Sequence, residues 1–139
     1  RKLPKKGAKG ERNAKRNGDM VQLIKAFQQI GDDNNGVFPM TGMACISTDC
    51  CCGYEDDDLI KLMEPYIKQP TDVKKYESSF YGYYYKNPYE YLSDGDVSGA
   101  YLIWQNEMLP DQAFFDLDDI TLCGPGHLGY GGWCVFKLD

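Results

Sequence analysis

Six cysteines are the residues of this 139-residue chain whose chemistry is easiest to predict. Four of them are crowded together and two lie near the C-terminus, and they are Cys45, Cys50, Cys51, Cys52, Cys123 and Cys134. This density is typical of exported proteins, so we expect disulfide bonds. Zinc is the alternative, with ligands drawn from the same cysteines and His127. The chain has no Cys-x-x-Cys pair, so the spacing gives zinc weak support.

One pairing is favoured on geometric grounds. Cys123 and Cys134 flank the glycine-rich segment 124–133, which is interpreted as a flexible loop with a strand-like exit. A disulfide at that place would stabilise the fold by roughly 2.5–3 kcal/mol in the loop-entropy treatment. Six cysteines allow many other pairings, so the sequence leaves the remaining partners open.

The single histidine argues against catalysis. His127 lies in a glycine-rich loop, and no Ser–His–acid or Cys–His set with helix or strand support is found. Residues 124–129 match GxGxxG, but the residues that follow are expected to form a strand, whereas a dinucleotide-binding loop opens a helix. Asp116, Asp118 and Asp119 are interpreted as solvated loop charges. We therefore expect no enzyme, no cofactor and no metal site.

Charge divides the chain into a basic arm and an acidic body. Residues 1–16 carry eight Lys or Arg and one Glu, a net charge of +7, whereas residues 17–139 carry a net charge of −13. An acidic body repels phosphate, which argues against a general nucleic-acid binder. The arm is expected to contact acidic faces of neighbouring copies, with DNA or an anionic surface as the alternative. The candidate contacts are Arg1, Lys2, Lys5, Lys6, Lys9, Arg12, Lys15 and Arg16.

The arm is expected to continue into an amphipathic helix that stops at Gly31. Apolar residues recur at steps of three and four, which places them on one helix face. They are Met20, Leu23, Ile24, Phe27 and Ile30. The opposite face is expected to carry Arg16, Asp19, Gln22, Lys25 and Gln29. Turn-forming residues follow at 32–36.

The rest of the chain is expected to form a small sheet. Residues 40–54 are interpreted as a loop, and the three Asp at 56–58 as the cap of a short helix over 59–66. β-prone segments at 80–85, 89–92, 100–104 and 133–138 predict three or four antiparallel strands. The tyrosines of residues 80–91 are interpreted mainly as a packed sheet face. The predicted class is α+β, with a long N-terminal helix packed on a three- to four-stranded antiparallel sheet.

Over most of residues 11–104 the chain resembles type IV pilins and the related pseudopilins. After the helix 11–30, residues 32–39 resemble the family's D-N-G-x-Y/F-P turn. Residues 62–70, with Asp72 in place, resemble its L-x-x-Y-I-x-x-P-x-D stretch, and a tyrosine-rich strand follows. The resemblance implies one pilin-like domain over 1–139. In it, 1–31 is the C-terminal half of the long helix, 32–75 a cysteine-bearing connection, and 76–139 the sheet and C-terminal loop, bounded by a Cys123–Cys134 disulfide.

The resemblance implies a structural subunit, major or minor, of a type IV pilus-like filament used in adhesion, twitching motility or DNA uptake. Its partners would be copies of itself, other pilins and the inner-membrane assembly machinery, with a surface ligand or DNA as a further partner. Because family members carry an apolar N-terminal helix, we expect one upstream of Arg1 as the only contact with the membrane. The subunit would lie in the inner membrane before assembly and in an extracellular filament afterwards.

Two alternatives remain at this stage. A type II secretion pseudopilin shares the same resemblance, although many pseudopilins have a calcium-binding loop of which this sequence lacks a clear version. The other alternative is a secreted carbohydrate-binding module that uses a tyrosine-rich face. For that module, Tyr83→Ala and Tyr85→Ala should abolish glycan binding while the fold is retained.

Overall fold

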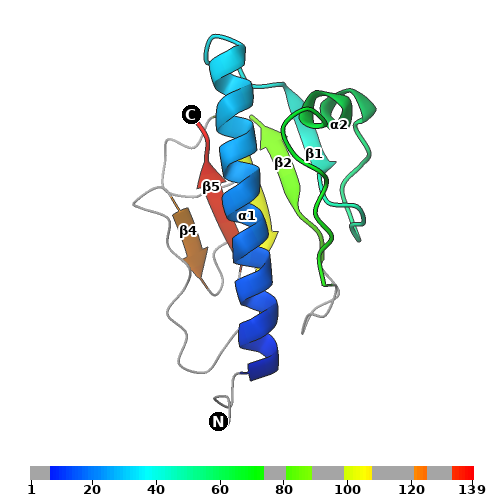
Figure 1. Cartoon of the computed structure of the whole chain (residues 1–139), viewed down its shortest axis with the longest axis vertical. Coiled ribbons are helices and arrows are strands. Elements are labelled where there is room, and N and C mark those ends of the chain that lie inside the picture. The colour runs from blue at the N-terminus through cyan, green and yellow to red at the C-terminus, as the bar shows by residue number, and fades with distance from the viewer. Residues whose placement is uncertain (1–6, 74–80, 89–98, 108–120, 125–132) are drawn as a thin grey trace.

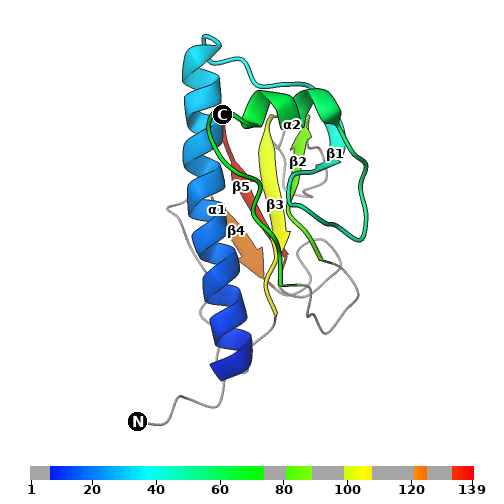
Figure 2. The ribbon, with the colours of Figure 1, turned by 45° about the vertical axis from the view of Figure 1, so that its right-hand side comes forward.

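The computed structural model describes residues 7–73, 81–88, 99–107, 121–124 and 133–139. The elements in chain order are α1 (Gly7–Asp33), β1 (Thr41–Cys45), α2 (Asp57–Met63), β2 (Tyr84–Asn87), β3 (Tyr101–Gln105), β4 (Thr121–Gly124) and β5 (Trp133–Lys137). Helix α1 lies along one face of the sheet, and α2 lies near the end of the sheet at which α1 ends (Figures 1 and 2). The predicted α+β class, with an N-terminal helix and an antiparallel sheet, is confirmed.

The sheet has one strand more than the sequence predicted. All five strands form one sheet in the order β1-β2-β3-β5-β4, and every neighbouring pair is antiparallel. Strand β1 falls in the segment predicted as a loop, and β4 has no counterpart in the prediction. Both are short and lack the run of aromatic or β-branched residues that marks strands in a sequence. The strand predicted at 89–92 lies outside the described residues.

Helix α1 ends at Asp33, two residues beyond the predicted stop at Gly31. The prediction is wrong because the chain reverses only at Asn35 and Gly36, whose φ angles are 58° and 80°. Gly31 serves packing instead, since a Cβ at this position would lie 2.6 Å from Cζ of Phe38. A glycine near the end of a helix can therefore mark a close contact as well as a stop.

The hydrophobic core lies between α1 and the face of the sheet that it covers. From α1 it takes the predicted apolar face, Met20, Leu23, Ile24, Phe27 and Ile30, all of them buried. From the sheet it takes alternate residues of the strands, Ala44, Tyr85, Leu102, Trp104, Cys134 and Phe136. The rings of Phe27 and Tyr85 stack with their centroids 4.9 Å apart. The predicted apolar face of the helix is thus confirmed as the side that meets the sheet.

Three consecutive tyrosines, Tyr84 and Tyr85 of β2 and Tyr83 just before it, are interior residues of the protein. Tyr83 and Tyr85 belong to the core under α1, and Tyr84 belongs to a smaller apolar cluster with other residues. All three are fully buried. The Tyr83 hydroxyl donates to Asp19 Oδ2 at 2.7 Å, and the Tyr85 hydroxyl donates to the Pro39 carbonyl at 2.5 Å. The interpretation of these tyrosines as packing residues is confirmed, and they offer no exposed ring on which a sugar could stack.

Helix α2 begins after a residue that caps it. The Asp56 carboxylate accepts a hydrogen bond from the amide of Leu59 at 3.0 Å, which is the capping role predicted for the three Asp at 56–58. The helix covers Asp57–Met63 and so starts and ends earlier than the predicted 59–66. Its buried residues Leu59 and Met63 join the core under α1.

Candidate functional site

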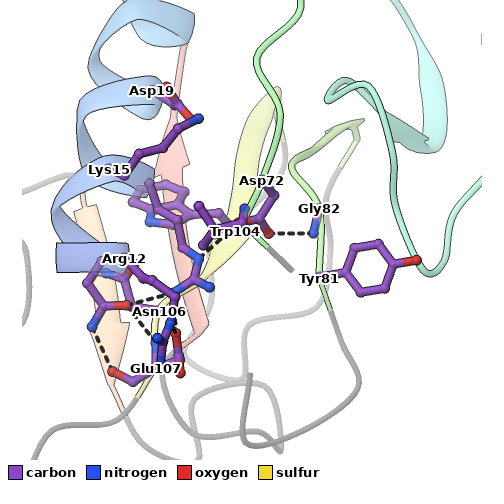
Figure 3. A network of polar contacts seen from close by, with 12 residues as sticks. Arg12, Lys15, Asp19, Asp72, Tyr81, Gly82, Trp104, Asn106 and Glu107 are labelled. Atoms are coloured by element: carbon purple, nitrogen blue, oxygen red, sulfur yellow. Dashed lines mark hydrogen bonds and ion pairs between the residues drawn. The ribbon is translucent and has the colours of Figure 1, made fainter. Parts of the chain in front are cut away.

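The first half of α1 is held to the sheet by buried charges. Arg16 is fully buried, and its Nε donates to Asp72 Oδ1 at 2.9 Å while its Nη1 donates to Glu107 Oε2 at 2.9 Å. The side chains of Asp72 and Glu107 are only 0% and 2% exposed. These three residues and Arg12 are called the anchor cluster below, and Figure 3 labels three of them, Arg12, Asp72 and Glu107.

Arg12 and two backbone contacts complete the anchor cluster. Nε and Nη2 of Arg12 donate to the two carboxylate oxygens of Glu107 at 2.5 and 2.6 Å, in a bidentate pair. Asn13 exchanges two hydrogen bonds of 2.8 Å with the backbone of Glu107. Asp72 Oδ2 accepts the amide of Gly82 at 2.8 Å. The helix is thereby tied to two segments that are distant from it in the sequence, at Asp72 and Glu107, and Asp72 is in turn tied to a third at Gly82.

The sequence-based assignment of Arg16 to the solvent-facing side of the helix is wrong, because its side chain is buried. The sequence analysis assigned it to the face opposite the apolar residues, but it precedes Met20, Leu23 and Phe27 at the same steps of four, three and four. Its guanidinium therefore points at the sheet, where two carboxylates compensate for the water that it loses. Because Arg16 is fully buried, its charge is not available to a neighbouring copy.

The other basic residues proposed as filament contacts differ in their placement. Arg12 is about one-fifth exposed and pairs with Glu107, and Lys15 on the helix surface pairs with Asp19 one turn later. Lys9 is half-buried and has a partner of its own. Four of the candidates lie outside the described residues, and they are Arg1, Lys2, Lys5 and Lys6.

The pKa of Glu107 reflects this environment. Burial raises the pKa of the carboxyl group, but the hydrogen bonds and charges of Arg12 and Arg16 outweigh burial, so the pKa lies below its ordinary value of 4.5. The hydrogen bond with Glu107 in turn raises the pKa of the Arg12 guanidinium. Glu107 and Arg12 therefore stay charged at neutral pH.

We expect the Glu107→Gln variant to lose less stability in acid than the unchanged chain. Folding lowers the pKa of Glu107. The stability that this carboxylate contributes is therefore fully present above its ordinary pKa of 4.5, and it is lost as the pH falls through the lower pKa of the folded state. Urea unfolding at about pH 7 and about pH 3.5 measures this, because the free-energy gap between the two proteins should narrow in acid. An equal gap at both pH values would contradict the assignment.

Cys45, Cys50, Cys51 and Cys52 are called the cysteine cluster below. They lie where segment 46–54 folds back against strand β1. The amide of Cys45 donates to the carbonyl of Tyr54 at 2.9 Å, so the chain leaves β1 and returns along its edge. Gly53 makes this return possible with a φ angle of 74°, in the left-handed region that favours glycine. The disulfides are Cys45–Cys50 and, between adjacent residues, Cys51–Cys52. The prediction of disulfides is confirmed for these four cysteines.

The last pair of cysteines is described in part. Cys134 is disulfide-bonded and fully buried, which confirms a disulfide at this residue. Strands β4 and β5 place the Cα atoms of Cys123 and Cys134 opposite each other. The side chain of Cys123 lies outside the described part of the chain, so their pairing stays a prediction. His127, Asp116, Asp118 and Asp119 lie outside it as well.

We expect removal of the Cys45–Cys50 disulfide by Cys45→Ala with Cys50→Ala to lower the free energy of unfolding by about 2 kcal/mol, because a six-residue loop gains freedom in the unfolded chain. The matched control, Cys51→Ala with Cys52→Ala, opens a much smaller ring and should cost about 1 kcal/mol. Thermal or urea unfolding of both variants checks the order. A larger loss in the control would contradict the loop-entropy account.

A hollow of about 410 Å³ lies beside the cysteine cluster, within the size range of small-ligand sites. Part of its wall is apolar or sulfur-containing, with both disulfides, the Tyr54 ring and Ile60. Its charged lining residues are Asp49, Glu55 and Asp57, and no Lys, Arg or His is among the lining residues. Such a surface repels anions and can bind a positively charged group with an apolar stem.

Sequence reasoning missed Glu107, Asn13 and Asn17 as site residues. Asn17 Oδ1 accepts hydrogen bonds from Trp104 Nε1 at 3.3 Å and Asn106 Nδ2 at 3.0 Å, which extends the polar contacts beyond the anchor cluster. The signal for these residues was the repeat of Arg and Asn at positions 12–13 and 16–17, one helical turn apart. Nothing local in the sequence marked Glu107, since its role depends on where strand β3 ends.

No protein-family model matches this chain, and no curated protein and no solved structure matches it. The resemblance of residues 11–104 to type IV pilins therefore stays a prediction. In the part of the chain that the structure describes, no helix combines the length and apolar content needed to cross a bilayer. The same residues contain no group of three or more His, Cys, Asp or Glu side chains placed to hold a metal ion.

Proposed function

We propose that this chain is a structural subunit of a type IV pilus-like surface filament. The observation that supports this most is the placement of α1, whose 27 residues run along one face of an antiparallel sheet. Its first turns extend beyond the ends of the strands (Figure 2). A helix of this kind can continue into a filament core while the sheet stays at the surface, which agrees with the resemblance of residues 11–104.

The anchor cluster suits such a role. In a filament, subunits are joined through their helices, so each helix must stay fixed to its own domain. Arg12 and Arg16 fix α1 to Glu107 and Asp72 just where the helix leaves the sheet, through charge-assisted hydrogen bonds. The disulfides of the cysteine cluster are typical of exported proteins and support the same location.

Assembly would proceed by polymerisation and not by catalysis. An apolar helix ahead of α1 would leave the membrane and bundle with its copies, driven by burial of apolar area. The contacts between copies would be heterologous and non-closing, which produces an open helical array. The proposal therefore requires the natural gene to encode, upstream of Arg1, a stretch of about 20 apolar residues.

A fusion experiment tests the proposal. The chain is fused behind an apolar pilin helix and expressed in a type IV pilus-assembling strain that lacks its own major pilin. We expect it in the membrane fraction and in sheared surface filaments, and the control with a polar helix of equal length should yield neither. Short filaments confined to the periplasm would instead indicate a pseudopilin. A fully soluble monomer from the apolar fusion would contradict the proposal.

A further inference from the structure

We propose that the hollow beside the cysteine cluster binds a lysine side chain from the basic arm of a second copy of this chain. The inference rests on the proposed filament, and it names one contact between subunits. It is carried by three observations on the described residues and the sequence: the build of the hollow, the charge of its lining and the charge of the arm.

The hollow is held open by covalent and backbone bonds. The Cys45–Cys50 and Cys51–Cys52 disulfides both line it, and the hydrogen bond from the Cys45 amide to the Tyr54 carbonyl joins two more parts of its lining. The Tyr54 hydroxyl accepts the amide of Gly42 at 2.9 Å, which fixes the ring although the residue is 47% exposed. A hollow built in this way loses little conformational entropy when a side chain enters it.

The lining of the hollow matches the two parts of a lysine side chain. Glu55 and Asp57 form no salt bridge with any described residue, so none of these residues neutralises their negative charges. The disulfides, the Tyr54 ring and Ile60 supply apolar surface for the methylene stem. An ammonium group at the carboxylates, with its stem on the sulfur-containing wall, satisfies both parts of the lining.

The basic arm is the cation source that the chain itself supplies. Residues 1–16 carry a net charge of +7, and Lys2, Lys5 and Lys6 fall within a few residues of one another. Arg12 and Arg16 are excluded as donors because both already pair with Glu107. Contact between an arm and the hollow of the next copy is heterologous, and it repeats from copy to copy without closing.

Zero-length carbodiimide cross-linking tests the contact in the full chain. Equal amounts of ¹⁴N- and ¹⁵N-labelled protein are mixed at high concentration, cross-linked and analysed by mass spectrometry. We expect mixed-label amide links from Glu55 or Asp57 to Lys2, Lys5 or Lys6, which fall at about 1 M salt because charges are then screened. Links only within one label, or links unaffected by salt, would overturn the inference.

Matched variants make the test specific. Glu55→Gln with Asp57→Asn removes the carboxylates that the carbodiimide activates, so this variant is read by binding of the arm peptide in the NMR titration below, which it should weaken about fivefold. Asp58→Asn is the control, because Asp58 is an exposed first-turn residue of α2 that does not line the hollow. A synthetic peptide of residues 1–10 should likewise shift the amide resonances of Gly53 and Tyr54 in an NMR titration, and the same peptide with its lysines replaced by glutamine should not.

The outcomes separate this inference from the proposed function. If the apolar fusion assembles into filaments but the double variant binds the arm peptide as tightly as the unchanged chain, the contact is wrong and the filament proposal stands. If the peptide binds the hollow but the fusion stays monomeric, the filament proposal fails and the hollow is a cation site without an assembly role. Equal shifts from the lysine and glutamine peptides would overturn the inference.

Discussion

Replacing Arg16 with methionine should lower the free energy of unfolding by about 3–5 kcal/mol. The side chain is fully buried and pairs with two carboxylates that are themselves inside the protein. Methionine fills similar space but removes the guanidinium from Asp72 and Glu107, and breaking a buried ion pair by removing one partner is costly. Glu107 keeps its bidentate pair with Arg12. Urea unfolding at neutral pH, followed by circular dichroism, measures the loss.

Lys15→Met is the matched control, because it removes a positive charge from the same helix one residue away. The Lys15 side chain is 43% exposed and pairs with Asp19, so its loss should cost less than about 1 kcal/mol. The account predicts a clear gap between the two variants. An Arg16→Met protein as stable as the Lys15→Met protein would show that the anchor cluster does not hold α1 in solution.

Replacing Phe27 with alanine should cost about 3–5 kcal/mol, because it opens a cavity in the middle of the core. Phe27 is fully buried and its ring stacks on Tyr85 at 4.9 Å, so both the transfer energy and the ring contact are lost. Thermal unfolding measures the change. The neighbouring Gln28 is exposed, so Gln28→Ala serves as control and should change stability by less than about 0.5 kcal/mol. Similar values for the two variants would contradict the placement of α1 on the sheet.

Because Tyr83 and Tyr85 are buried, their replacement by alanine cannot test a carbohydrate-binding face. Tyr83→Ala and Tyr85→Ala were the test for a carbohydrate-binding face, with the fold retained. Both residues are fully buried under α1, and both use their hydroxyls inside the protein. Their replacement should therefore destabilise the fold, so a loss of binding in these variants would say nothing about a sugar site.

Periodic patterns predicted the parts of this fold whose positions depend on neighbouring residues in the chain. The steps of three and four through Met20, Leu23 and Phe27 located the buried helix face, and residues 100–104 and 133–138 located two central strands. The cap at Asp56 followed from its side-chain chemistry. These features are local, so the sequence contains enough information to place them.

Features that depend on distant segments escaped the sequence analysis. Arg16 looked like a solvent-exposed charge because lysine and arginine are rarely buried without a partner, and its partners lie 56 and 91 residues further along the chain. Strand β1 forms because β2 pairs with it, not because Thr41–Cys45 has a strong preference for strand. The hollow likewise forms where segment 46–54 returns to β1, and no local sequence motif predicts this return.

The central claim is that this chain is built into a surface filament, and immunogold electron microscopy tests it most directly. Cells that produce the protein from its own gene are labelled with antibodies raised against residues 7–73, the largest continuous described segment. The account predicts gold particles along filaments that extend from the cell surface, and their loss when the gene is deleted. Gold confined to the cell interior, with unlabelled filaments or none, would contradict it.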